Sequence, residues 1–334
     1  MTLEEVRDTA MRGLTNSGIS EENATVIADV MTTAERDGCK SHGLFRMPGY
    51  CASSRSGRVD GKVTPTLHDD APGVIRVDGH HGFTAPAMAA GRPALVEKVR
   101  SQGIAAMPIL NACHFAALWY DVDALVEDGL VAFAFVNSRS FVAHTGGIRK
   151  LYGTNPMAFG WPRPGKPPMI FDQASSASAR GEMQIHLRDG LDIPEGWAID
   201  PEGNPTTDPE AGLAGAQLPF GGHKGAAIAM MVELLAVGLT GCKFGFESAQ
   251  DENKDGGPSE GGELLIAMDP ARFGGTGGSD AALEHAELLF KEILQEEGTR
   301  LPSDRRYEAR KVTPTEGIII PESLHNTIKE YCDH

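Results

Sequence analysis

Hydrophobic residues recur along the chain with two different spacings, which predict a mixture of strands and helices. Residues 73–79, GVIRVDG, alternate between apolar and polar positions, as a half-buried strand does. Continuous apolar runs of strand length follow further along the chain. We therefore expect additional strands at 104–110, 130–138, 168–174 and 263–269.

Helices are expected between these strands. Two are predicted within residues 3–36, the second with Ser20 as its N-cap and Glu21 and Glu22 in its first turn. The most apolar long stretch, residues 226–241, contains Glu233 and is too short to span a membrane, so we expect a buried core helix there. Other helices are predicted at 85–103, 120–129 and 279–296, and a last helical segment opens at 301–312.

Composition narrows the class of protein. The chain has 334 residues, of which 41% are hydrophobic, enough for a sizeable core in two structural units. Its net charge of −16 repels nucleic acid and anionic membranes, so we expect neither as a partner. Any anionic ligand must then be held by a local basic site. The acidic block DENKDGG, residues 251–257, is expected to be a solvated loop.

The cysteines and the N-terminus favour a cytoplasmic protein. The 5 cysteines form no C-x-x-C pair, so neither a disulfide framework nor a zinc ribbon is indicated. The N-terminal segment MTLEEVRDTAMRGL carries acidic residues and no long apolar run, which is unlike a secretory signal.

The segment SHGLFR, residues 41–46, is the first candidate for chemistry. If Ser41 caps a helix, His42 lies in the first turn and Arg46 follows one turn later on about the same face. Arg46 offers a planar fork that suits a carboxylate, and His42 is a candidate proton donor. The alternative is a capped surface helix with two exposed polar residues.

Two basic segments are candidates for phosphate binding. In GGHKG, residues 221–225, glycines surround His223 and Lys224 just before the apolar helix, so backbone N–H groups and Lys224 are able to hold a phosphate. The alternative is a tight turn that caps a core helix. In RLPSDRR, residues 300–306, three arginines lie close together, and the alternative is a solvated helix start capped by Ser303. No G-x-G-x-x-G occurs, so a Rossmann fingerprint is absent.

Histidines and acids elsewhere leave further possibilities. His114 ends an apolar strand before small residues, which fits a cofactor pocket or a satisfied core histidine. Asp172 ends another strand, where it is able to orient a histidine or to cap the next segment. His42, His114, His144, His223 and Asp172 match no compact metal-ligand spacing, so we expect no metal.

Taken together, the stretches DGCKSHGLFRMPGY, NACHFAALW, LYGTNPMAFGWP, IFDQASSASARGEMQ, LPFGGHKGAAIAMMVELLAVGLTG and RLPSDRR resemble the malate/L-lactate dehydrogenase family that lacks a Rossmann fold. The likeness runs in order from about residue 5 to 320. Within the family it is nearest to the branch that reduces Δ1-pyrroline-2-carboxylate and Δ1-piperideine-2-carboxylate. The 245–262 loop is acidic and departs from the family pattern.

The resemblance implies an α+β fold whose mostly antiparallel sheet carries NAD(P)H and whose helical part is formed by both chain ends. It implies about residues 1–70 with 305–334 for the helical part, 71–304 for the sheet-containing part, and a homodimer. The expected product is L-proline or L-pipecolate, with NADPH favoured and NADH possible. The rivals are a 2-hydroxyacid/2-ketoacid dehydrogenase and a non-catalytic carboxylate- or metal-binding protein.

The resemblance also assigns roles to individual residues. His42 would be the proton donor, with Ser41 and Asp172 completing a relay. The substrate would contact Arg46, Thr154, Arg180 and Gly181. The residues expected at the cofactor are His114, Phe115, Ala116, Ala117, Leu118, Asp172, Gln173, Ala174, His223, Lys224, Arg300, Leu301, Pro302, Ser303, Asp304, Arg305 and Arg306.

Overall fold

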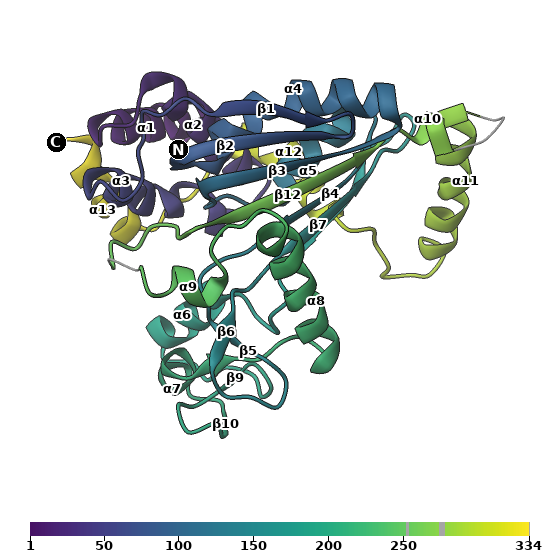
Figure 1. Ribbon diagram of the computed structural model, residues 1–334. Coiled ribbons are helices and arrows are strands. Elements are labelled where there is room, and N and C mark those ends of the chain that lie inside the picture. The colour runs from purple at the N-terminus through teal and green to yellow at the C-terminus, as the bar shows by residue number, and fades with distance from the viewer. Residues whose placement is uncertain (252–253, 274–277, 334) are drawn as a thin grey trace.

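A twisted seven-stranded sheet runs through the molecule (Figure 1). The computed structural model describes residues 1–251, 254–273 and 278–333. All neighbouring strands of this sheet are antiparallel except β2 and β3. In spatial order the strands are β1 (Thr66–Ala71), β2 (Val74–Phe83), β3 (Ile104–Cys113), β12 (Glu260–Met268), β4 (Val131–Val136), β7 (Met157–Trp161) and β8 (Met169–Gln173).

The main core lies between this sheet and two helices, α4 (Thr84–Gln102) and α5 (Trp119–Glu127). Leu95, Met107, Leu125 and Leu265 are among its fully buried side chains. Pro93 lies inside α4 without ending it. The strands predicted from the apolar runs are thus present, and because the central ones are covered by helices they lack polar alternation.

The two ends of the chain share a second core. Helices α1 (Leu3–Asn16), α2 (Glu21–Arg36) and α3 (Met47–Arg55) pack with α12 (Asp304–Glu316) and α13 (Glu322–Cys332). Buried Val6, Ile27, Ile318 and Ile328 belong to this one cluster. The predicted α+β fold, with a mostly antiparallel sheet and a helical part from both ends, is confirmed. The residue boundaries of the two parts stay a prediction.

A smaller five-stranded sheet projects from the end of the main one (Figure 1). Its strands span only two or three residues each, which leaves too little pattern to predict them.

Buried Glu233, the last residue of the helix His223–Glu233, accepts hydrogen bonds from Asn155 and Asn137, which explains a carboxylate in so apolar a helix. The elements are β10 (Pro205–Thr206), β9 (Ala198–Ile199), β11 (Ala216–Gln217), β5 (Val142–Ala143) and β6 (Lys150–Tyr152), with α6 (Arg180–Asp189), α7 (Pro209–Ala214), α8 (His223–Glu233), a π-helical turn (Leu234–Gly238) and α9 (Gly245–Ser248).

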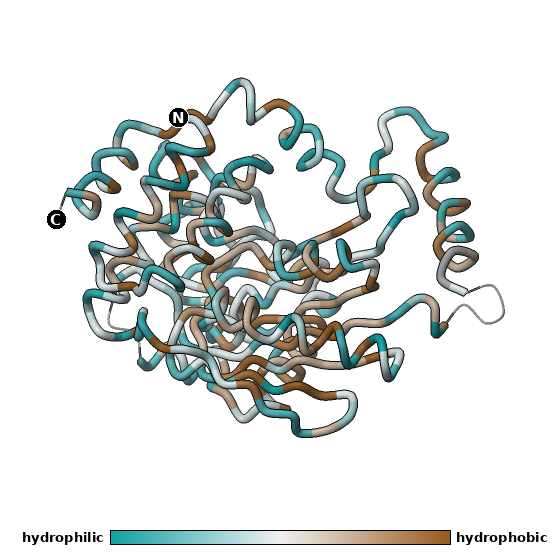
Figure 2. Tube along the Cα trace, turned by 90° about the horizontal axis from the view of Figure 1, so that it is seen from above, coloured by the Kyte–Doolittle hydropathy of each residue, from teal (hydrophilic) through white to brown (hydrophobic). Residues whose placement is uncertain are grey.

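One helix stands apart from the body. After α10 (Pro270–Phe273), α11 (Gly278–Ile293) projects beside the sheet, and it is separated from the rest of the chain in both views (Figures 1 and 2). Glu287 of α11 pairs with Arg163 and Lys166 of the β7–β8 turn. Across the described ranges, no helix is long and apolar enough to cross a bilayer.

The acidic block behaves differently from the prediction of a solvated loop. Asp255 forms an ion pair with Arg58 at 3.0 Å, and its side chain is nearly buried. Gly257 is buried because its Cα lies against the Ser53 side chain and the Gly49 carbonyl of α3. This part of the block is therefore fastened to the helical part of the fold. Residues 252–253 of the block lie outside the described residues.

Candidate active site

The SHGLFR segment folds as two consecutive 3₁₀ turns, Lys40–His42 and Leu44–Arg46, rather than as the predicted helix capped by Ser41. Buried Glu35 of α2 accepts the Leu44 N–H at 2.9 Å and so holds the backbone between the turns. A Cβ at Gly43 would lie 2.1 Å from a Glu35 carboxylate oxygen, which explains the glycine. Helix α3 begins only at Met47.

His42 sits at the end of the first turn. Its Nδ1 lies 2.9 Å from the Ser41 hydroxyl, so two of the three predicted relay members are in contact. Burial lowers the pKa of His42 to about 3, and the nearby Arg46 and His114 contribute in the same direction. The imidazole is therefore neutral at pH 7 while no anion lies beside it, whereas the sequence predicted a pKa near the working pH.

Arg46 faces the same region without a counter-ion. Its guanidinium lies over the Phe115 ring at 4.6 Å, and burial lowers its pKa. Its buried Nε has no hydrogen-bond partner among the residues that the structure describes. A buried guanidinium without a paired carboxylate is costly, and an anionic ligand would satisfy it. The role of Arg46 at the substrate stays a prediction, and the predicted helical spacing from His42 is wrong because two 3₁₀ turns replace the helix.

Asp172 fastens the segment that follows β3. Its carboxylate accepts the Trp119 N–H at 3.0 Å, just after residues 114–118. Burial raises its pKa, and Arg306 and His114 are near enough to oppose that effect. Over the described part of the chain, no hydrogen bond joins Asp172 to His42. Asp172 thus holds the segment expected at the cofactor, and its part in a proton relay stays a prediction.

The residues after Asp172 connect the main sheet to α8. The Ser175 N–H donates to the Thr154 carbonyl at 2.7 Å, and the Ser175 carbonyl accepts the Phe220 N–H at 3.0 Å. At Gly225 a Cβ would lie 2.3 Å from the Phe220 carbonyl, so only glycine allows this approach. The end of β8, with Gln173 and Ala174, therefore lies between Thr154 and the start of α8.

The GGHKG segment forms the N-terminus of α8. Gly221 and Gly222 have φ values of +54° and +62°, which the absence of a side chain permits. His223 and Lys224 occupy the first two helical positions and are exposed. The N–H groups of Lys224, Gly225 and Ala226 already donate to backbone carbonyls of residues 220–222, so the exposed ammonium of Lys224 is the group that suits a phosphate.

Arg180 begins α6 over a second aromatic ring. Its guanidinium lies 4.2 Å from the centre of the Phe141 ring, and burial, with Arg139 nearby, lowers its pKa to about 10. Two neighbouring arginines favour an anion between them. Gly181 follows in the first turn of α6, with open space where a Cβ would stand.

The three arginines of RLPSDRR do not form one cluster. Arg306 lies over Trp119 at 4.6 Å, where its Nη2 donates to the Ile170 carbonyl, while Arg300 and Arg305 are exposed. Ser303 has a φ of +80°, and its hydroxyl pairs with both backbone groups of Ile170 instead of capping α12. Leu301 is buried and its N–H donates to Asp304, whereas Pro302 is exposed.

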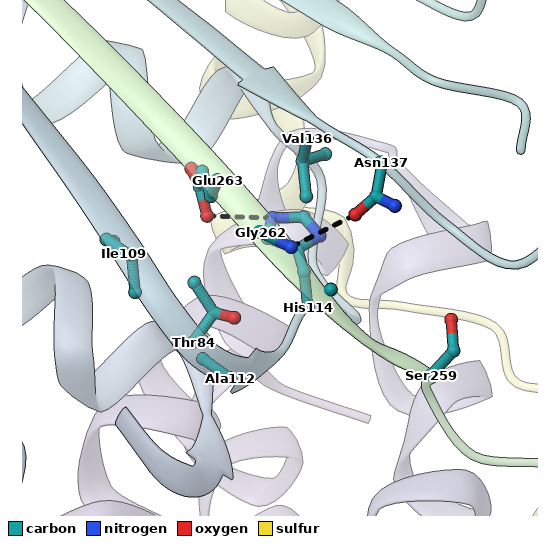
Figure 3. Close-up of a pocket in the computed structure, with 10 residues that line it drawn as sticks. Thr84, Ile109, Ala112, His114, Val136, Asn137, Ser259, Gly262 and Glu263 are labelled. Atoms are coloured by element: carbon teal, nitrogen blue, oxygen red, sulfur yellow. Dashed lines mark hydrogen bonds and ion pairs between the residues drawn. The ribbon is translucent and has the colours of Figure 1, made fainter. Parts of the chain in front are cut away.

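Two buried acids near His114 were missed by the sequence analysis. His114 Nε2 lies 3.4 Å from Asp121 of α5. It also lies 4.0 Å from Glu263 of β12 (Figure 3). The only hint was Glu263 at an inward position of an otherwise apolar strand. Within the described ranges, these three residues alone are placed to share a metal ion. Of the residues considered from the sequence as metal ligands, His42, His114 and Asp172 lie near one another, whereas His144 pairs with Tyr152.

The comparison of the whole sequence with protein families decides the relationship. Residues 1–329 match the family described as malate/L-lactate dehydrogenase. The chain belongs to the malate/L-lactate dehydrogenase family. This confirms the resemblance carried by the sequence motifs. The family is one of nicotinamide-dependent dehydrogenases.

Individual members of the malate/L-lactate dehydrogenase family are similar over almost the whole chain. The Δ1-pyrroline-2-carboxylate/Δ1-piperideine-2-carboxylate reductase of Pseudomonas aeruginosa is 51% identical over 98% of both chains. The crystal structure of Δ1-piperideine-2-carboxylate reductase from Pseudomonas syringae superimposes with a TM-score of 0.93, at 43% identity and 99% coverage of each chain. The (2R)-3-sulfolactate dehydrogenase (NADP(+)) of Chromohalobacter salexigens is 42% identical over 99% of this chain and 97% of its own.

Proposed function

We propose that the protein is an NAD(P)H-dependent reductase of Δ1-pyrroline-2-carboxylate and Δ1-piperideine-2-carboxylate, with L-proline and L-pipecolate as products. The observation that carries the proposal is the buried guanidinium of Arg46 near His42, whose Nε has no partner among the described residues. It suits a small carboxylate placed beside a group that exchanges protons. The two reductases with 51% and 43% identity support the cyclic imine as the substrate class.

The residues expected at the cofactor fit a dinucleotide. The buried Nε of Arg306 has no partner in the described chain, and Lys224 is exposed at a helix N-terminus. Residues 114–118 and 172–174, joined through the Asp172–Trp119 hydrogen bond, would hold the nicotinamide half. When bound, NAD(P)H supplies the hydride. Lys224 and the start of α8 would hold a phosphate.

The chain's own residues would position and protonate the substrate. Arg46 would bind the carboxylate in a fixed plane, with Arg180 as a second cation and Thr154 and Gly181 along the same wall. His42, backed by Ser41, would give its proton to the imine nitrogen, which makes the ring carbon a better hydride acceptor. A carboxylate beside Arg46 offsets the charge that lowers the pKa of His42, so substrate binding itself favours the protonated imidazole.

A 2-hydroxyacid dehydrogenase is the second candidate. It is supported by the 42% identical sulfolactate dehydrogenase, whose substrate also carries a carboxylate. The deciding experiment compares kcat/KM for the two cyclic imines with pyruvate, oxaloacetate and 3-sulfopyruvate, each with NADPH and NADH. The proposal requires a cyclic imine to be the best substrate. A better 2-ketoacid would reverse the order of the two candidates.

NADPH is the proposed coenzyme. Arg300 and Arg305 are exposed and suit a 2′-phosphate, whereas Arg188 is paired with Asp189. The same substrate panel tests this preference. If kcat/KM is the same with NADH as with NADPH, Arg300 and Arg305 do not bind a 2′-phosphate.

We also propose a cytoplasmic homodimer. Leu288 and Leu289 of the projecting α11 are 59% and 61% exposed, and a second copy of the chain would cover them. Sedimentation velocity should give twice the chain mass. The substitution Leu289→Lys should shift the protein toward monomer, and an unchanged dimer would place the contact elsewhere.

A further inference from the structure

Beneath the candidate active site lies a closed group of one histidine and two acids. Glu263 comes from β12, Asp121 from α5 and His114 from the segment after β3, and their nearest polar atoms all lie within 4.8 Å of one another. The Glu263 side chain is 2% exposed and that of Asp121 is 4% exposed. Figure 3 shows the His114 ring facing the Glu263 carboxyl group.

Both Glu263 oxygens lack a hydrogen-bond donor in the part of the chain that the structure describes. Asp121 is the acceptor that Glu263 faces, and two ionised carboxylates cannot lie side by side without water between them. The arrangement is satisfied when Glu263 carries a proton. Its O–H then donates to Asp121, which also accepts from His114 Nε2.

We propose that Glu263, as a neutral acid, is a positioning residue that donates to Asp121 and thereby holds His114 as the neutral Nε2–H tautomer at the head of segment 114–118. The role rests on the proposed function only in so far as that segment binds the cofactor. Asp121 shares its charge between two donors, so it attracts a second proton to His114 less strongly.

The charge of His114 also affects the protonation of His42. His114 is one of the groups whose charge lowers the pKa of His42, so a protonated His114 would make it harder for His42 to acquire its proton. A neutral His114 avoids that repulsion. Glu263 thus acts on the proton donor through two intervening side chains and touches neither substrate nor cofactor.

Other titratable groups surround this cluster from several elements. Tyr50 of α3 and Asp172 of β8 both lie near enough to feel the charge of Asp121. Asn137, which follows β4, pairs with Gly262 and Glu233 rather than with Glu263. Burial and the neighbouring Asp121 raise the pKa of Glu263 well above its ordinary value.

The test compares Glu263→Gln, which keeps a neutral donor, with Glu263→Leu, which does not. Nitrogen-15 NMR of the imidazole rings should show His114 as a constant Nε2–H tautomer from pH 6 to 8 in the native protein and in E263Q. In E263L, the His114 ring signals should no longer match that single tautomer. In E263L, kcat/KM should fall about tenfold, the scale of a lost hydrogen bond to a charged group. E263Q should stay within about threefold of the native protein.

A second measurement does not depend on the folding of E263L. Because the folded state holds the Glu263 proton more tightly than the unfolded state, the free energy of unfolding of the native protein should fall as pH rises above 4.5. E263Q lacks this group, so its stability relative to the native protein should rise with pH. If the free energies of unfolding of E263Q and of the native protein differ by a constant amount from pH 5 to 8, the inference is overturned.

Two other results would also overturn it. One is an NMR spectrum of E263L in which His114 has the same tautomer as in the native protein. The other is a stoichiometric divalent metal that a chelator removes together with activity, since the cluster would then be a metal site. Neither NMR nor unfolding needs a substrate. A protein inactive on cyclic imines but with the expected tautomers would therefore contradict the proposed function and leave this inference standing.

Discussion

Binding of a carboxylate beside Arg46 should draw a proton onto His42. In the free protein the pKa of His42 is about 3, with the charge of Arg46 as the second contribution after burial. An opposite charge within a few ångströms moves a pKa by ~1–3 units, so a shift of 2–3 units would bring His42 to between about 5 and 6. At pH 5.5 the complex would then have taken up between about 0.2 and 0.8 proton per site.

Calorimetry with an unreactive analogue measures this uptake directly. Pyrrole-2-carboxylate has the planar ring and the carboxylate but no imine to reduce. Titrations in two buffers with different ionisation enthalpies give the number of protons bound per ligand. The uptake should decline as pH rises toward 8, because the unbound and bound forms of His42 are then both neutral.

His42→Asn is the matched control, since it keeps a polar group of similar size without the titrating ring. It should bind the analogue with no proton uptake at any pH. The native protein binding the analogue with no uptake at pH 5.5 would refute the coupling between Arg46 and His42. The same uptake in both proteins would assign the proton to another group.

Four further predictions use single substitutions. Arg46→Lys should cost ~1–3 kcal/mol in kcat/KM while dinucleotide affinity stays unchanged, and Arg46→Ala should no longer prefer an acid to its amide. Lys224→Ala should raise the KM for the dinucleotide and flatten its salt dependence, and a change confined to the imine KM would contradict the phosphate role. Gly225→Ala should lower the free energy of unfolding by ~1–3 kcal/mol in urea titrations, since its Cβ would meet the Phe220 carbonyl at 2.3 Å; native stability would contradict this. Between pH 6.5 and about 3, His42 binds fewer protons in the folded state than in the unfolded state, so it lowers the free energy of unfolding of the native protein as pH falls. The free energy of unfolding of His42→Asn, relative to that of the native protein, should therefore increase by ~2 kcal/mol from pH 7 to pH 5. Parallel stability curves for the two proteins would refute the low pKa.

The long strands of the main sheet were predictable because most of them are continuous apolar runs or alternate between apolar and polar residues. The strand β7, of five residues, and the small sheet, with strands of two or three residues each, were not predicted, since such short strands show no clear period. The union of both chain ends was expected only through the resemblance to the family. No local pattern shows that Val6 and Ile328 share one core.

At the site, residue types were easier to predict than geometry. Arg46 as a carboxylate fork stays a prediction, and its place was derived from a helix where the structure has two 3₁₀ turns, held by the Glu35–Leu44 hydrogen bond. RLPSDRR indicated a cluster of three arginines, but only the guanidinium of Arg306 lies over the Trp119 ring, and the other two arginines are exposed. Asp121 and Glu263 lie far apart in the sequence, so only the packing of α5 against the sheet reveals that they share a proton-binding cluster.

The core shared by the two chain ends affects how the protein can be made. Apolar side chains of α1 and α2 leave the ribosome about 300 residues before Ile318 and Ile328, which pack in the same cluster. At ~5–20 residues per second, that delay is on the order of 15–60 s. During this time the nascent helices α1 and α2 expose an apolar surface, and contacts between residues so far apart in the sequence also form slowly. Chaperone occupancy of ribosome-bound chains should therefore be highest near residues 3–31 and should persist until Ile318 and Ile328 have emerged.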